Sequence, residues 1–287
     1  MIIYATTIHK PALKSLWKTC FEDSNEFIEF YFDCIYQDEN SLIFLDENNI
    51  PIAFLQIIPY QLKLGTKIYD AGYISGAMTH PKHRKKGYMQ QLLEVTFVHM
   101  KKLNYAFTFL IPEENWLFDF YAKYGYTKAF PKSINTIDLK LTDKLIYQDV
   151  NVYQDINNIP IKAIYSLYTQ LQNRKINIVT KTQMQFKYIL QDLFISKGCI
   201  FYLKDKGIAF VVLEKNNLLI KELLYTEENV KLSLLNAIKA TFNLDKAIIL
   251  NEPVEKNMHF YGMIKILNPF VFQETLPVDI YMNMMLD

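Results

Sequence analysis

The sequence predicts an α/β (α+β) fold made of two similar units in tandem, each a mixed, mostly antiparallel sheet flanked by helices. The 287 residues are enough for two domains, and 51% of them are apolar, so each half can bury its own core. The predicted order of two helices, a hairpin, a strand, a helix and a strand occurs in the first half and again in the second. The polar stretch 143–158 is the expected linker, which places the domains at 1–142 and 150–287.

In the first half, apolar spacing indicates strands where it alternates and helices where it recurs every three to four residues. The predicted elements are, in order, a strand at 2–5, helices at 12–21 and 27–36, strands at 41–45, 51–59 and 69–78, a helix at 86–103, a strand at 105–111, a helix at 115–124 and a strand at 133–139.

The second half repeats this order without detectable sequence identity to the first. The predicted elements are helices at 161–172 and 182–193, a hairpin of strands 199–203 and 208–213, a strand at 218–225, a helix at 229–242 and a strand at 247–250. The two halves even share a local pattern, Tyr124-Gly125-Tyr126 in the first and Tyr261-Gly262-Met263 in the second.

Composition argues against several functional classes. The formal net charge is +1, which gives no general attraction to nucleic acid or to an anionic membrane. The three cysteines are scattered, which indicates a reduced, cytoplasmic protein rather than a disulfide framework or a zinc site. No apolar run approaches the roughly 18 residues that span a bilayer. His80 and His83 lack a nearby third ligand, so no metal is expected.

One basic segment, Arg84-Lys85-Lys86-Gly87-Tyr88-Met89, joins a predicted strand to a predicted amphipathic helix. The start of a helix exposes unpaired N–H groups at the positive end of its dipole, which suits a pyrophosphate. Gly87 lets the backbone approach such an anion closely, and three cationic side chains add charge. The segment has neither the glycine and lysine spacing of a P-loop nor the three glycines of a dinucleotide fold.

The segment resembles the Arg-x-x-Gly-x loop of the GNAT acetyltransferases. Phe120-Tyr121-Ala122-Lys123-Tyr124-Gly125-Tyr126 is similar to the second signature of that family, at a typical distance from the first. The sequence around Pro81-Lys82-His83-Arg84 resembles the tandem-GNAT enzymes of the Eis type, and so does the run Phe109-Leu110-Ile111-Pro112. Those enzymes continue into a sterol-carrier-like third domain, for which we expect too few residues here.

This resemblance implies an N-acyltransferase that moves an acetyl group directly from acetyl-CoA to a primary amine of a small molecule or peptide. It implies that the backbone of Ala77, Met78 and Thr79 binds the pantetheine arm and that the loop from Arg84 to Met89 holds the pyrophosphate. Tyr121 would be the general acid that protonates the leaving sulfur. Asp287, the last residue of the sequence, is a candidate for the general base because Eis-type enzymes are thought to use a terminal carboxylate.

Alternatives remain at this stage. The chain could be a non-catalytic acyl-CoA-binding protein, or a tandem-GNAT aminoacyl transferase, which should lack an intact loop. Glu26, Glu29 and Asp33 either form a solvated helix face or attract a cationic amine. In the second half, Glu227 and Glu228 stand where a phosphate would bind, so we expect no coenzyme there. The acceptor amine and a homo-oligomeric state are left open.

Overall fold

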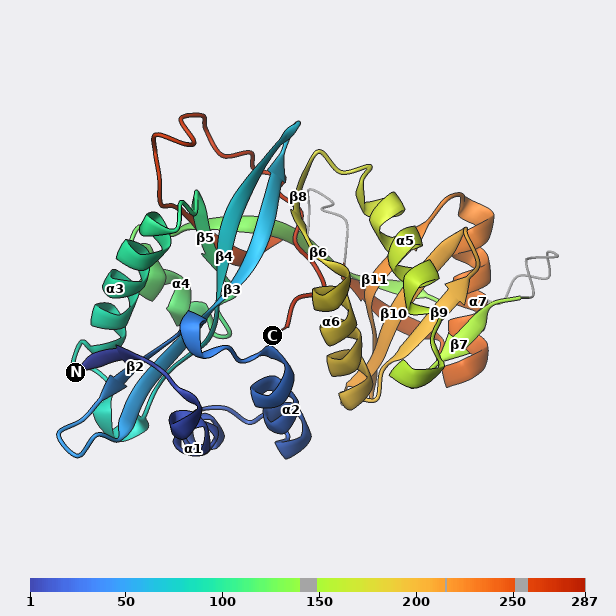
Figure 1. Cartoon of the computed structure of the whole chain (residues 1–287). Coiled ribbons are helices and arrows are strands. Elements are labelled where there is room, and N and C mark those ends of the chain that lie inside the picture. The colour runs from blue at the N-terminus through green and yellow to red at the C-terminus, as the bar shows by residue number, and fades with distance from the viewer. Residues whose placement is uncertain (140–148, 215, 251–257, 287) are drawn as a thin grey trace. The chain divides into compact units, whose positions relative to one another are not determined.

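The computed structural model describes residues 1–139, 149–214, 216–250 and 258–286, which form two compact units. Unit 1 comprises Met1–Lys128 and Gly262–Leu276, and unit 2 comprises Ala129–Tyr261 and Pro277–Leu286. The colours of Figure 1 show that the last part of the chain returns to both units.

The sheet of unit 1 is built around one long hairpin. Its strands lie in the order β1 (Ile2–Tyr4), β2 (Ser41–Leu45), β3 (Pro51–Leu64), β4 (Lys67–Thr79), β5 (Phe107–Leu110) and β13 (Met258–Ile266). Neighbouring strands pair antiparallel, except β4 and β5, which run parallel.

The two faces of this sheet are covered by different helices, as the alternation of β3 residues requires. Ala53, Leu55 and Ile57 pack in one apolar cluster with side chains of α3 (Tyr88–Lys102) and α4 (Asn115–Ala122). Phe54, between them, faces Trp17 of α1 (Lys10–Cys20), and α2 (Asn25–Phe30) continues into a π-helical turn, Tyr31–Ile35, on that same side. Figure 1 shows α3 and α4 together, and α1 and α2 together, at this sheet.

Unit 2 repeats the plan of unit 1. Its sheet has the order β6 (Thr127–Asp138), β12 (Lys246–Leu250), β11 (Asn217–Tyr225), β10 (Gly207–Glu214), β9 (Cys199–Leu203) and β7 (Asn151–Tyr153), and again one pair, β11 with β12, is parallel. Helix α7 (Glu228–Phe242) packs on one face through Val230, Leu234 and Ile238. Helices α5 (Ile161–Gln172) and α6 (Gln183–Ile195) pack on the other, around Phe210.

The predicted fold class is confirmed, but two strands differ from the predicted arrangement. β6 follows α4 in the chain yet pairs with β12 of unit 2, and β13 comes from the second half yet pairs with β5 of unit 1. β8 (Asn177–Thr180) and β13 were not predicted at all. Of the expected linker 143–158, the described part contains β7 and a 3-10 turn, Ile156–Asn158, and residues 143–148 lie outside the described residues.

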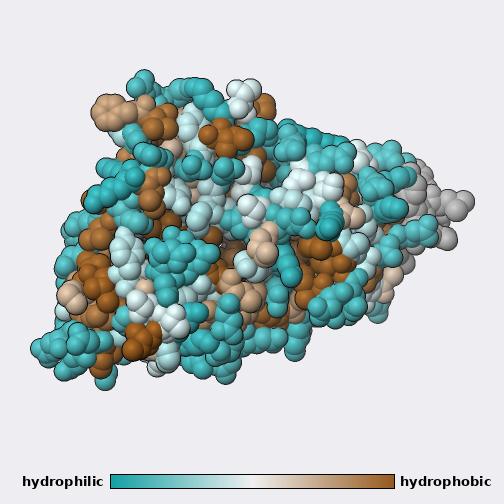
Figure 2. Space-filling view, in the orientation of Figure 1, coloured by the Kyte–Doolittle hydropathy of each residue, from teal (hydrophilic) through white to brown (hydrophobic). Residues whose placement is uncertain are grey.

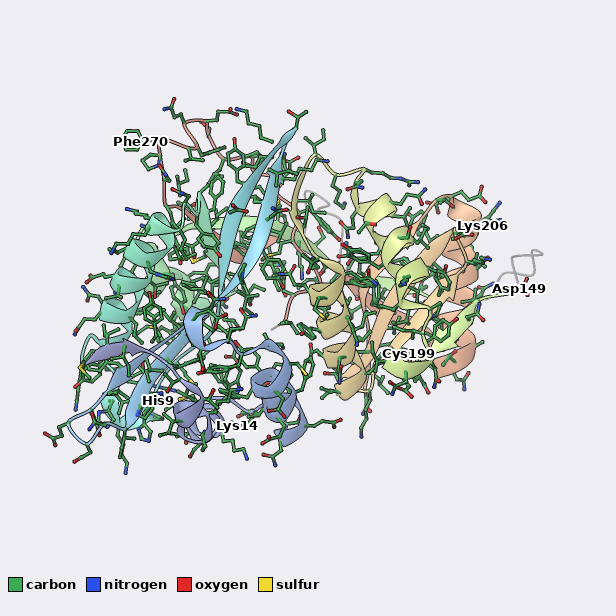
Figure 3. The ribbon with its side chains drawn as sticks, viewed as in Figure 1. His9, Lys14, Asp149, Cys199, Lys206 and Phe270 are labelled. Atoms are coloured by element: carbon green, nitrogen blue, oxygen red, sulfur yellow. The ribbon has the colours of Figure 1, made fainter. Side chains whose placement is uncertain are left out.

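The surface mixes hydrophilic and hydrophobic side chains, as the face drawn in Figure 2 shows. Phe270 is the most exposed large apolar side chain of the described residues, at 88%, and Figure 3 shows it at the outside of the segment that follows β13. Among the described residues, no helix is both long and apolar enough to cross a membrane.

Candidate active site

The predicted site begins where β4 separates from β5. The two strands pair from Ala71 to Tyr73 only, and β5 ends at Leu110 while β4 continues to Thr79. A bulge lies in this free part of β4, because the register with β3 shifts between Ser75 and Met78. Gly76 at the bulge has a φ of +60°, and a Cβ there would lie 2.7 Å from the ring of Trp17. Only glycine therefore fits this bend.

The separation leaves one edge of β4 without a strand partner among the described residues from Ile74 to Thr79. Backbone N–H and C=O groups at such an edge can pair with an extended ligand. Ala77, Met78 and Thr79, the predicted contacts of the pantetheine arm, all lie on this edge. Whether they bind the arm stays a prediction.

The basic loop follows β4 directly and is held to the end of that strand. Residues 80–87 connect Thr79 to the first residue of α3, and a short 3-10 turn, Pro81–His83, opens the loop. Arg84 folds back so that its Nε donates to the carbonyl oxygen of Thr79 at 3.1 Å. Cys20 Sγ also lies 3.5 Å from that oxygen. The loop is therefore anchored at its base and presents its tip to solvent.

The tip has the backbone that an anion site needs. Lys85 and Gly87 both take a positive φ, +62° and +81°, which is uncommon for a residue other than glycine. Gly87 is the N-cap of α3, and a Cβ on it would meet nothing within 4 Å. The first turn of α3 contains no acidic residue. Lys85 and Lys86 are exposed beside it, so the site offers open space, helix N–H groups and positive charge to a phosphate.

Tyr88 and Met89 begin α3 with half-buried side chains rather than free ones. Both pack against the apolar cluster of unit 1, and the Tyr88 ring lies 4.5 Å from that of Phe44, centroid to centroid. Of these two residues, only the backbone N–H groups in the first turn are therefore suited to a ligand.

Tyr121 lies in the same apolar cluster as the start of α3. It is 6% exposed, and its ring contacts those of Phe120 and Tyr126, with centroids 5.1 and 5.8 Å away. Burial raises the pKa of Tyr121 above its usual value of 10.0, so the hydroxyl keeps its proton. Within the described parts of the chain no group hydrogen-bonds to this hydroxyl. Asp287, the predicted base, lies outside the described residues.

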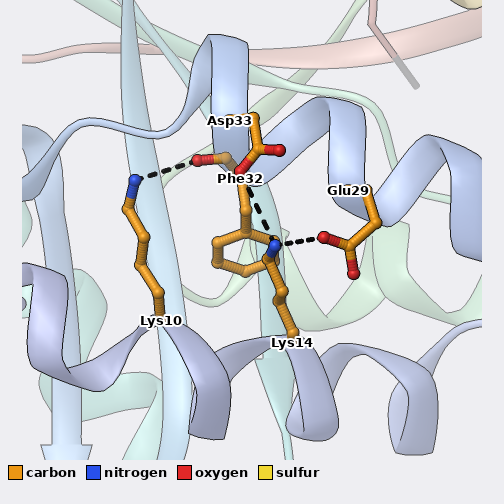
Figure 4. Close-up of polar contacts among 5 residues, drawn as sticks. All are labelled: Lys10, Lys14, Glu29, Phe32 and Asp33. Atoms are coloured by element: carbon orange, nitrogen blue, oxygen red, sulfur yellow. Dashed lines mark hydrogen bonds and ion pairs between the residues drawn. The ribbon is translucent and has the colours of Figure 1, made fainter.

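The acids of the second helix are engaged in ion pairs. Glu29 and Asp33 both pair with Lys14 of α1, and the second N–O distance is 3.6 Å; Figure 4 shows the three side chains together with Lys10, which donates to the carbonyl of Phe32. This pairing favours the solvated-face interpretation of these two residues. Glu26 is exposed.

A different group of acids, which the sequence analysis missed, adjoins Trp17, whose ring packs against Gly76 of β4. Burial raises the pKa of Glu113, just after β5, and the negative charges of Asp23, Glu114 and Glu22 raise it further. Asp23 accepts a hydrogen bond from Trp17 Nε1 at 2.7 Å. These acids lie in two loops, one after α1 and one before α4, that meet only in three dimensions, so no sequence spacing could have revealed them.

The matching junction of unit 2 has no such loop. Only Thr226 and Glu227 separate β11 from α7, and the helix begins at Glu228. Glu228 accepts a hydrogen bond from the Tyr225 hydroxyl at 3.3 Å and pairs with Lys231. The two predicted carboxylates therefore do lie at the helix start. Within the described parts of the chain, no group of three or more His, Cys, Asp or Glu side chains could hold a metal.

A parallel strand pair that separates ahead of a basic, glycine-capped helix is the arrangement that the resemblance to the GNAT acetyltransferases led us to expect. Comparison with known families agrees: residues 2–129 match the family model described as an acetyltransferase (GNAT) domain. Residues 2–129 of unit 1 thus carry a GNAT acetyltransferase domain. Over these residues the match agrees with the family that the sequence motifs predicted.

Solved structures share the fold over nearly the whole chain. A probable N-acyltransferase from Enterococcus faecalis V583 has a TM-score of 0.77 at 17% identity, covering 96% of this chain and 74% of its own. A GCN5-related N-acetyltransferase from Anabaena variabilis has a TM-score of 0.71 at 18% identity, and the match covers 93% of this chain and 73% of that protein. Eis1 from Mycobacterium abscessus has a TM-score of 0.69 at 10% identity, and the match covers 93% of this chain and 74% of that protein. A search of curated proteins finds no match.

Proposed function

We propose that the chain transfers an acetyl group from acetyl-CoA to a primary amine, and that unit 1 is the catalytic unit. The observation that carries this proposal is the continuity of the free β4 edge with the loop at Gly87. A coenzyme A molecule is long, with a diphosphate at one part and an amide-rich arm leading to the thioester. Unit 1 offers an anion site and a free hydrogen-bonding edge in immediate succession.

In this proposal, the α3 N–H groups, Lys85 and Lys86 hold the diphosphate, and Ala77 to Thr79 pair with the arm. Arg84 would act mainly by fixing the loop, because its Nε is used by Thr79. Acetyl-CoA supplies an activated acyl group, whose carbonyl carbon is attacked by the amine. A backbone N–H at the free edge could stabilise the negative charge that develops on the carbonyl oxygen.

The acids around Glu113 support a cationic acceptor. They lie in loops adjoining the ends of α1 and β5, and Cys20 at the end of α1 lies against Thr79, so the acids adjoin the mouth of the free edge. Amines are mostly protonated at neutral pH, and a group of carboxylates raises their local concentration. One proton must then leave the ammonium group before attack, and Asp287 is our candidate to receive it.

The reaction forms a C–N bond and breaks a C–S bond, and the nitrogen loses the proton that the sulfur needs. Tyr121 would donate its hydroxyl proton, or a strong hydrogen bond, to the departing sulfur. Its burial keeps the hydroxyl neutral, which is the form required of a donor. We propose that unit 2, which lacks the loop, binds no coenzyme and serves as a partner domain.

The test is a binding titration with a matched pair of variants. Gly87→Glu places a side chain and a negative charge at the anion site, and acetyl-CoA affinity should fall at least about tenfold, or about 1.4 kcal/mol. Gly65→Glu is the control, because Gly65 also has a positive φ of +60° and open space around a Cβ, but it lies in the turn between β3 and β4. Equal affinity in both folded variants would refute the assigned donor site.

Turnover is tested separately by following the release of free CoA with a panel of amines. Acceleration by a cationic primary amine, with an N-acetylated product detected by mass, is expected. Binding of acetyl-CoA without any amine-dependent release would instead identify the non-catalytic acyl-CoA-binding protein. Transfer from aminoacyl-tRNA, with no acetyl-CoA binding, would identify the aminoacyl transferase.

A further inference from the structure

Helix α4, which carries Tyr121, ends against a lysine from the distant strand β13. Lys265 Nζ donates to the carbonyl oxygen of Tyr124 at 2.6 Å, across a separation of 141 residues. Carbonyls at the end of a helix lack partners within the helix, and a cation there also complements the negative end of the dipole. Burial and the charge of Lys101 lower the pKa of Lys265.

The glycine of the second signature fits this contact. Gly125 has a φ of +83°, and an ideal Cβ on it would lie 2.6 Å from Lys265 Nζ. The ammonium group thus occupies the space that any other residue at position 125 would use. The hydrogen bond from Lys265 to Tyr124 therefore requires the absence of a side chain at Gly125, the next residue.

The same lysine also reaches the aromatic neighbours of Tyr121. Lys265 Nζ lies 4.9 Å from the centroid of the Phe97 ring, and Phe97 packs on Tyr126 at 5.9 Å. Tyr126 contacts Tyr121 edge-on, and its hydroxyl bonds Thr108 Oγ1, 3.1 Å away and opposite Lys265 in the strand register. The turn after α4 is tied to Tyr121 as well, because the N–H groups of Tyr124 and Tyr126 both donate to its carbonyl.

We propose that Lys265 is a positioning residue for catalysis, which fixes the end of α4 and thereby the hydroxyl of Tyr121. It touches no reacting atom, and it acts on the rate only through Tyr121. The inference rests on the proposed function, in which Tyr121 is the proton donor. Lys265 lies in the part of β13 from Gly262 onward, which belongs to unit 1 although it comes far along the chain.

The test is a double-mutant cycle on turnover. Lys265→Met keeps most of the side-chain volume and removes the donor, and kcat should fall about tenfold while the Kd of acetyl-CoA changes less than twofold. Lys265→Arg should recover part of the loss. Lys128→Met is the matched control, because Lys128 Nζ lies over the Phe118 ring of α4 at 5.5 Å but has no bond to the helix end; it should leave kcat unchanged.

The decisive measurement is the same substitution in a Tyr121→Phe background. If Lys265 acts through Tyr121, Lys265→Met should then cause almost no further loss. An equal loss in both backgrounds, or an unchanged kcat in the single variant, overturns the inference. Full turnover in Tyr121→Phe alone overturns the proposed acid itself, so the two failures are distinguishable.

If Lys265→Met does not fold, Gly125→Ala provides the same test. The added methyl group displaces the ammonium group from the end of α4, at a backbone φ of +83° that favours glycine. The kcat loss and its disappearance in the Tyr121→Phe background should be reproduced. A Gly125→Ala variant with full kcat refutes the positioning role.

Discussion

Tyr121 combines burial with a hydroxyl that has no hydrogen-bond partner within the described parts of the chain. A buried hydroxyl ordinarily finds a partner, as the neighbouring Tyr126 does with Thr108. The Tyr121 hydroxyl is therefore available to donate to a ligand, although its ring is packed in the apolar cluster. The adjacent rings fix the direction of its side chain.

Removing this hydroxyl should affect the chemical step alone. Tyr121→Phe keeps the ring and its contacts, so we expect kcat to fall about 10²-fold while the Kd of acetyl-CoA stays within twofold. In the wild type, burial raises the pKa of Tyr121 above 10.0, so the donor stays protonated through pH 9. Loss of kcat on the alkaline side should therefore begin only above about pH 10. Retained turnover in the variant would return Tyr121 to a purely structural role.

At the scale of elements, apolar periodicity predicted most strands and helices correctly. Ser41–Leu45 and Ile161–Gln172 have the predicted bounds, because polar turns limit the first and Pro160 precedes the second. The hairpin of β3 and β4 is longer than predicted, since its outer part, up to Leu64 and from Lys67, includes exposed residues. β13 was missed because its burial depends on pairing with β5, which its own sequence does not specify.

The proposed donor site could be placed from the sequence because its residues are contiguous. Strand end, loop and helix start follow one another from Ala77 to Met89, so local rules suffice to place them. The acids around Glu113 could not be predicted, and neither could the contact of Lys265 with the carbonyl oxygen of Tyr124. Each of these contacts joins segments that only the fold brings together. The engagement of Glu29 and Asp33 by Lys14 likewise depends on how α1 packs beside α2.

Strand β11 carries a buried acid that provides a test within unit 2. Glu222 is fully buried, and its Oε1 accepts hydrogen bonds from Gln172 and, at 2.6 Å, from the Tyr281 hydroxyl. Glu222 Oε2 and Gln172 Oε1 are buried without a partner in the described structure. Burial raises the pKa of Glu222, although the charges of Lys132, Lys175 and Lys181 oppose that shift. A proton on the Glu222 carboxyl would add a hydrogen-bond donor beside two buried oxygens, Glu222 Oε2 and Gln172 Oε1, that have none.

Neutralising this acid should stabilise unit 2 at higher pH. The pKa of Glu222 is higher in the folded protein than in the unfolded chain. The protonated Glu222 therefore contributes fully to the free energy of unfolding below about pH 4, and this stabilisation is lost as the pH rises through the folded pKa. Glu222→Gln cannot ionise, so its thermal midpoint should exceed that of the wild type at pH 8, by a margin that shrinks toward pH 5. Asp245→Asn, an exposed acid paired with Lys239, should show no such gain. A lower midpoint at pH 8 would mean that the three lysines outweigh burial.

At the scale of the whole molecule, the two units are linked by more than one crossing of the chain. The predicted domain 1–142 contains β6, which pairs in unit 2, and lacks β13, which pairs with β5 of unit 1. A cut at the predicted linker would therefore leave β5 without its antiparallel neighbour and β12 without β6. Unpaired edges of buried strands are prone to association, so experiments on this protein need the full chain.

The two units share a plan but differ where a phosphate would bind. This difference predicts how many acetyl-CoA molecules each chain binds. Unit 1 has residues 80–87, with cationic side chains and an open Gly87, between its strand and helix, whereas unit 2 has only Thr226 and Glu227 before a helix that starts with Glu228. Two carboxylates complement the helix dipole but repel a diphosphate a few ångströms away. Titration of the full chain by calorimetry should therefore give one acetyl-CoA per chain, and Gly87→Glu should weaken all measurable binding. Two equivalents per chain, or an unchanged second site in Gly87→Glu, would show that unit 2 binds the donor by means other than a helix start.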